Sequence, residues 1–118
     1  MMGRLHQALL TIDKAIAQLK RHGELFMPEL QRTRGEVLEK TADERGAEEA
    51  LCRSIELADQ QSALSWRLRA SMSLARLQDR RGRREEARDA LAETYARFSE
   101  GFDTADLKAA ERLLATPR

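Results

Sequence analysis

Two stretches of the chain carry the same arrangement of small and large residues, and this arrangement decides the fold. They read RGEVLEKTADERGAEEALCRSIE at residues 34–56 and LARLQDRRGRREEARDALAETYA at residues 74–96. When Ala47 is aligned with Ala87, each stretch has a large apolar residue four positions later, Leu51 in the first and Leu91 in the second. Each also has a small residue twelve positions earlier, Gly35 in the first and Ala75 in the second. A pattern that recurs in this way predicts two copies of one helix pair.

The same register extends to the N-terminal end of the chain. Ala8 lies 39 residues before Ala47, which in turn lies 40 residues before Ala87. The positions that follow also agree, with small residues and then large apolar ones: Ile12, Leu51 and Leu91; Ala15, Ser54 and Thr94; Ile16, Ile55 and Tyr95. We therefore expect the first helix of the chain to be an orphan second helix of a pair.

Gly35 lies inside a predicted helix, where glycine costs about 0.5–1 kcal/mol relative to alanine. Its presence indicates that another helix passes too close for a side chain. Ala75 is the matching small residue of the second copy. Close antiparallel packing of the paired helices follows.

Apolar residues recur at helical spacing along most of the chain, which predicts six helices and no strand. The pattern is interrupted at Gly23, at Gly82, and at the pair Asp43 and Gly46. Pro28 suits the first turn of a helix. Asp103 or Thr104 can cap the last helix. The predicted helices span about residues 4–22, 28–41, 47–60, 63–81, 84–98 and 105–115. They form a single domain over residues 1–118, organised as an orphan helix (1–23), two repeats (28–60 and 63–98) and a capping helix (103–115).

Composition narrows the function classes. Charged residues make up 35% of the chain, but 21 basic and 20 acidic side chains leave a formal net charge of only +1, which disfavours nucleic acid as a partner. No stretch approaches the roughly 20 apolar residues that span a bilayer, so we expect no membrane partner. The single cysteine, Cys52, follows Leu51 and is expected to be a packed, inert thiol in a cytoplasmic protein.

The small-residue pattern resembles the tetratricopeptide repeat, in which a small residue marks the crossing of the first helix over the second. The resemblance implies an all-α fold of antiparallel helix pairs in a right-handed solenoid with a C-terminal capping helix. The period here is longer than the usual 34 residues, most of the large aromatics of the first helices are missing, and no proline closes either repeat. A plain helical bundle is the alternative.

A narrower resemblance rests on three segments: residues 74–77 (LARL), 82–88 (GRREEAR) and 100–108 (EGFDTADLK). They are similar to the C-terminal region of large bacterial signalling proteins, in which a cyclase or DNA-binding domain precedes a predicted ATPase and a tetratricopeptide-like tail. The resemblance implies a tail that docks or senses. It carries over no active-site residue.

The residues that bear chemistry form no catalytic or cofactor motif. A phosphate-binding loop is absent, and His6 and His22 are too far apart for a pair of helical metal ligands. Cys52 has no nearby histidine or second cysteine, and catalysis by this thiol would need a basic partner and an exposed thiolate. We therefore expect no enzyme activity, no cofactor and no metal.

Two sets of polar side chains are candidates for binding. If a peptide lies along the first helices of the pairs, the residues expected to contact it are Gln31, Arg34, Arg67, Ser71 and Gln78. A basic turn could bind an anion through Arg80, Arg81, Arg83 and Arg84, although helix-end stabilisation and the following Glu85 and Glu86 also explain it. Trp66 is expected to pack between neighbouring repeats.

These observations favour a protein–protein interaction or scaffolding module without catalysis. The alternative is an effector-sensing regulatory tail of a bacterial adenylate cyclase or transcriptional regulator, as the resemblance implies. Because about two and a half repeats are fewer than such arrays usually need, a homodimer formed through the N-terminal helix is a further expectation.

Overall fold

The computed structural model describes residues 2–22 and 25–115, leaving aside the side chains of residues 2 and 19–22. This part of the chain is all-helical and contains no strand. Gly23, expected to end the first helix, lies outside the described residues. The helices are α1 (Met2–His22), α2 (Met27–Lys40), α3 (Glu44–Gln60), α4 (Leu64–Arg80), α5 (Arg84–Ala96) and α6 (Ala105–Ala115).

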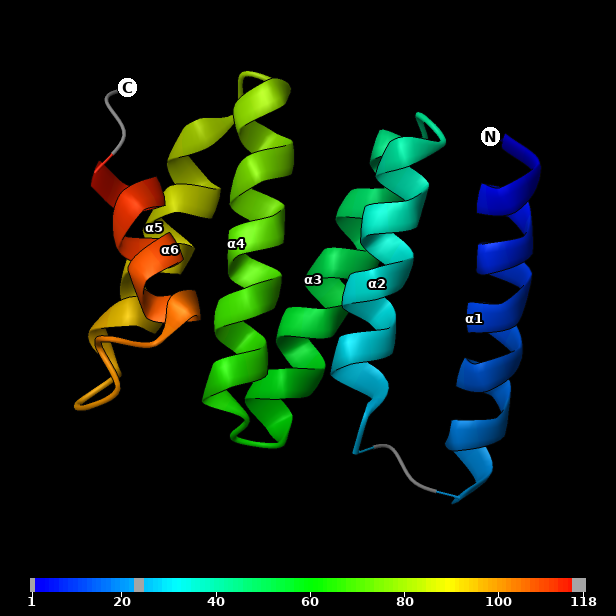
Figure 1. The fold of residues 1–118 in the computed structure, drawn as a ribbon, viewed down its shortest axis with the longest axis horizontal. Helices are drawn as coiled ribbons and strands as arrows, with labels where there is room; N and C mark the ends of the chain where they lie inside the picture. Colours follow the sequence, from blue (N-terminus) through cyan, green and yellow to red (C-terminus); the bar gives the residue numbers. More distant parts are fainter. Residues whose placement is uncertain (1, 23–24, 116–118) are drawn as a thin grey trace.

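The helices form two layers (Figure 1), with α2, α4 and α6 in one and α3 and α5 behind them. Helix α2 pairs with α3, and α4 pairs with α5. Helix α4 also packs against both members of the preceding pair, and α6 packs against both α4 and α5. The position of α6 thus corresponds to that of α4, one helix pair further along the chain.

Three turns connect α2 to α5, and they share one backbone geometry. The middle residue of each turn has a positive φ: 65° at Ala42, 54° at Ser62 and 72° at Gly82. The amide of the residue after it donates a hydrogen bond to a carbonyl five residues earlier, as in Asp43 to Leu38 and Arg83 to Gln78. Three-residue turns of one type therefore separate α2, α3, α4 and α5, and their middle residues are 20 positions apart.

Helix α3 begins at Glu44 rather than at Ala47, because Asp43 caps it instead of only breaking the pattern. The amide of Gly46 donates a 2.9 Å hydrogen bond to the Asp43 carboxylate. A side-chain acceptor at this position satisfies an amide that would otherwise lack an intrahelical partner. Gly46 therefore lies in the first turn of the helix. Similarly, the amide of Leu107 donates to the hydroxyl of Thr104 at the start of α6.

The prediction of a close helix crossing at Gly35 is confirmed. A Cβ atom placed on Gly35 would lie 2.8 Å from Cγ of Leu51 and 3.2 Å from the carbonyl oxygen of Ala47. Ala47 and Leu51 are both fully buried. Nearby, the buried hydroxyl of Ser54 donates a 2.6 Å hydrogen bond to the carbonyl of Pro28. The small residues of the sequence pattern thus let α2 and α3 approach closely.

Helix α1 is the least integrated element of the described chain, because its helix contacts are with α2 alone. Ile12 is buried in this contact, while Leu5, Ala8, Leu9, Ala15 and Ile16 are only half-buried. The corresponding residues of α3, which packs between α2 and α4, include the fully buried Ala47, Leu51 and Ser54. The apolar stripe of α1 is therefore incompletely covered.

Candidate interaction face

The first helices of successive pairs are joined by charged side chains along one face. Arg69 of α4 lies between two carboxylates, 2.9 Å from Asp106 of α6 and 3.7 Å from Glu29 of α2. Its hydrogen bond to Asp106 and the charge of that carboxylate raise the pKa of Arg69 above its usual value. One arginine thus links all three helices. We call the surface of α2, α4 and α6 that carries this network the charged face.

The network continues along α2. The guanidinium of Arg32 lies 3.0 Å from Glu29 and 3.1 Å from Glu36. Glu36 also accepts a 3.0 Å hydrogen bond from the hydroxyl of Ser73 on α4. Burial by itself would lower the pKa of Arg32, but its hydrogen bonds to the two glutamates and their charges raise it. The side chains of Arg32 and Glu29 are only 19% and 23% exposed, so this part of the network is partly buried.

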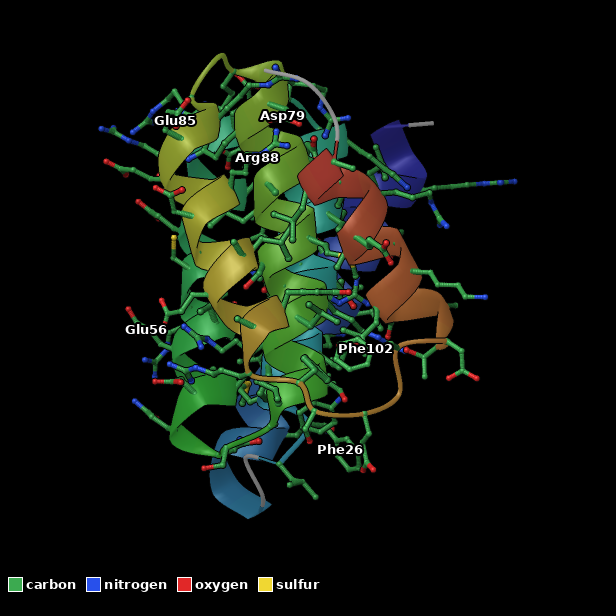
Figure 2. The ribbon with its side chains drawn as sticks, turned by 90° about the vertical axis from the view of Figure 1, so that its left-hand side faces the viewer. Phe26, Glu56, Asp79, Glu85, Arg88 and Phe102 are labelled. Carbon is green, nitrogen blue, oxygen red and sulfur yellow. The ribbon has the colours of Figure 1, made fainter. Side chains whose placement is uncertain are left out.

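Aromatic residues gather at one end of this face. In Figure 1, the start of α2, the α3–α4 turn and the α5–α6 loop all lie at the lower end. Phe26 and Trp66 pair with ring centroids 6.0 Å apart, and Tyr95 and Phe102 pair at 5.9 Å. Trp66 therefore contacts the preceding helix pair, as expected. Figure 2 shows Phe26 and Phe102 at the same end, on the side away from α3.

Large apolar side chains at this end are open to solvent. Leu25 is 61% exposed, Phe26 is 58% exposed and Phe102 is 45% exposed. Trp66 is half-buried and packs against Phe26. We call Leu25, Phe26, Trp66 and Phe102 the aromatic end.

The five residues expected to contact a peptide do not form one surface. Gln31 is half-buried on α2. Arg34 points to α1, where its Nε lies 2.9 Å from the carboxylate of Asp13. Ser71 is 1% exposed and Gln78 is 7% exposed, so neither side chain is presented to solvent.

Arg67, the fifth of these residues, lies in a separate cluster near the α3–α4 turn. Its side chain is nearly buried, and its closest carboxylate oxygens are 3.8 Å away on Asp59 and 3.9 Å away on Glu93. Arg97 approaches the same two carboxylates at 3.5 and 2.8 Å. Two guanidinium groups and two carboxylates thus balance one another on the side of α3 and α5, away from the charged face.

The basic turn is neutralised within the fold. Arg80 pairs with Glu39, Arg81 lies 2.5 Å and Arg83 lies 3.4 Å from Glu48, and Arg84 lies 3.1 Å from Asp79. The hydrogen bond from Arg81 lowers the pKa of Glu48 despite the opposing effect of burial. All four arginines therefore have a carboxylate partner, and two of them act as links between α3 and the α4–α5 turn.

Cys52 differs from its expected packed state, because it is exposed on the outer side of α3. Leu51 beside it is fully buried, and adjacent helical residues point about 100° apart, so one neighbour faces the core and the other faces solvent. Partial desolvation of the thiol raises its pKa, and the charges of Glu48 and Glu56 raise it further.

The described residues contain no group of three or more metal-ligating side chains. His6 is exposed, whereas the side chain of His22 lies outside the described residues. None of the described helices combines the length and apolarity that a membrane crossing requires.

Several residues of the two surfaces were missed by sequence reasoning, although the period could have revealed them. Phe26 and Trp66 are 40 residues apart, and so are Glu29 and Arg69. Each of these pairs is in contact across α2 and α4. Equivalent positions on first helices lie side by side, so a search for complementary residues at this spacing would have found both. Comparison with known proteins adds no relative, since no family model, curated protein or solved structure matches the chain.

Proposed function

We propose that this chain is a non-catalytic protein-interaction module of tetratricopeptide-like architecture that binds a peptide or helix across the charged face and the aromatic end. The repeated packing of α4 and α6 on the pairs before them supports this architecture, as do the three turns of one geometry. Such stacking produces an extended surface from equivalent helices, on which a linear partner can lie.

The aromatic end is the observation that supports this proposal most directly. Phenylalanine and tryptophan are enriched at protein interfaces, and a few clustered residues usually supply most of the binding energy there. Phe26, Leu25 and Phe102 are exposed in a chain that has only five aromatic residues in all. Single exposed apolar residues are ordinary, but a group at one end of one surface is typical of a docking site.

The charged face supplies the polar part of the same surface. Arg69 is 46% exposed on its side chain and contacts carboxylates of two helices. Its pairs are solvent-accessible, so ionic groups of a partner can compete for them. An apolar anchor at one end and charged side chains along the remainder would fix both the position and the direction of a bound segment.

Selection from a random peptide library displayed on phage tests the proposal. The double variant Phe26→Ser and Phe102→Ser should bind the selected peptides at least tenfold more weakly than the unmodified chain does. This is roughly the cost of removing one interface anchor. Leu10→Ser is the matched control, because Leu10 is 57% exposed but lies on α1. Circular dichroism spectra should show intact helices in all variants. Equal binding by the double variant and the control would exclude the aromatic end.

Self-association through α1 is a second form of the same function. The half-buried stripe of α1 that includes Ala8 and Ala15 could be covered by the α1 of a second copy. Sedimentation at increasing protein concentration should then show a dimer that Ala8→Arg disrupts. Ala17→Arg, on the exposed side of α1, is the control. A monomer at millimolar concentration would rule out this arrangement.

A further inference from the structure

The loop between α5 and α6 places two unpaired acids next to the aromatic end. Glu100 and Asp103 flank Phe102, and both are exposed. Within the described part of the chain, neither has an ionic partner.

Four acids on the neighbouring helices are paired. Glu29 and Asp106 contact Arg69. Asp59 and Glu93 contact Arg97. Residues 98–110 contain one base, Lys108, against three acids, and only Asp106 of the three is neutralised. A negative charge thus stands uncompensated beside an exposed phenyl ring.

We propose that the partner segment carries an apolar anchor flanked by arginine or lysine, which docks at the aromatic end and pairs with Glu100 and Asp103. This inference rests on the proposed function and adds the chemistry of the partner. The apolar anchor covers Phe26 and Phe102, and the flanking cation lies toward the loop. An arginine at this place can also stack on an exposed aromatic ring, which attracts cations through its π-system.

Trp66 provides the measurement, because it is the only tryptophan of the chain and packs against Phe26. Two helical peptides without tryptophan serve as probes. Both carry leucines at helical spacing, with arginines flanking them in one peptide and glutamates in the other. Titration of each peptide should change Trp66 emission, and we expect the arginine peptide to bind about tenfold more tightly, as two surface ion pairs would produce.

The double variant Glu100→Lys and Asp103→Lys should abolish or reverse this preference. Its control, Glu49→Lys with Glu111→Lys, makes the same change in net charge at exposed acids of α3 and α6. The control should retain the preference, because those acids lie away from the aromatic end. Loss of the preference in both double variants would assign it to net charge and overturn the inference.

The peptide titrations distinguish failure of this inference from failure of the proposed function. If both peptides bind equally and Phe26→Ser weakens both, the docking surface stands and the cationic partner is wrong. Tighter binding of the glutamate peptide overturns the inference in the same way. If neither peptide binds, the partner chemistry is wrong, and the docking surface is judged by the peptides selected from the random library.

Discussion

The rings of Phe26 and Trp66 pack together at a centroid distance of 6.0 Å and an interplanar angle of 51°. They occupy equivalent positions, one at the start of α2 and the other in the first turn of α4, 40 residues later. Glu29 and Arg69 repeat this relationship one turn further along the helices. The contacts show that α2 and α4 lie in register, so equivalent positions of these two helices lie side by side.

Removing the Phe26 ring should expose Trp66 to water. We expect Phe26→Ala to shift the fluorescence maximum of Trp66 to longer wavelength, because the indole loses its aromatic neighbour. Leu10→Ala removes an exposed apolar side chain from α1 and should leave the spectrum unchanged. A Phe26→Ala spectrum identical to that of the unmodified chain would show that the two rings do not pack in solution.

Alanine at position 35 should destabilise the protein although it favours the helix. The added Cβ would meet Cγ of Leu51 and the backbone oxygen of Ala47, neither of which is the free end of a flexible side chain. Overpacking of this kind costs about 1–3 kcal/mol. Chemical denaturation should therefore give a lower midpoint for Gly35→Ala. Ala75→Gly tests the equivalent position, where it should destabilise through lost helix propensity. A more stable Gly35→Ala would contradict the close crossing.

Glycine should stabilise the two turns that lack it. Ala42 and Ser62 adopt positive φ, a conformation that costs a residue with a Cβ about 1–2 kcal/mol. Glycine also loses more entropy on folding, so we expect Ala42→Gly and Ser62→Gly to gain up to about 1 kcal/mol each. Gly82→Ala should lose about as much through its backbone alone, since its Cβ would meet no atom within 4 Å. Lower unfolding midpoints for both glycine variants would refute the shared turn geometry.

Acid should weaken the link between α3 and the α4–α5 turn. The hydrogen bond from Arg81 lowers the pKa of Glu48 in the folded chain. The resulting stabilisation is present above the pKa of glutamate in the unfolded chain and is lost as pH falls through the lower folded value. Between about pH 5 and pH 3, the unmodified protein should therefore lose more stability than Glu48→Gln. Glu49→Gln controls for removal of one carboxylate from the same helix, and identical pH profiles for the unmodified chain and Glu48→Gln would contradict this contribution.

The thiol of Cys52 should react more slowly with thiol reagents than its exposure to solvent would suggest. Partial desolvation and the charges of Glu48 and Glu56 raise its pKa, which reduces the thiolate that reacts at neutral pH. A thiol-specific reagent should label the folded protein more slowly than the denatured chain. Glu56→Gln should accelerate labelling, whereas Asp89→Asn, a change on α5, should not. Faster labelling of the folded protein would contradict the raised pKa.

The sequence by itself determined the helices, their pairing and the close crossing at Gly35. These features depend on local information, because apolar spacing defines a helix face and a small residue inside a helix marks a near neighbour. The predicted end of a helix agreed with the structure where a glycine marks that end, as at Gly82. The same reasoning misjudged the start of α3, because Asp43 both interrupts the apolar pattern and caps the helix.

Only the tertiary structure decided which side chains share a surface. Ser71 and Arg69 are two residues apart on α4, yet Ser71 is buried whereas Arg69 lies between Glu29 and Asp106. The rotation of α4 about its own axis determines which of its side chains are buried. That rotation depends on simultaneous packing against α2, α3, α5 and α6. The chain between Phe26 and Phe102 also passes through turns at Ala42 and Ser62, where positive φ occurs without a glycine that would have indicated it in the sequence. Packing between helices distant in sequence therefore fixed the candidate interaction surface.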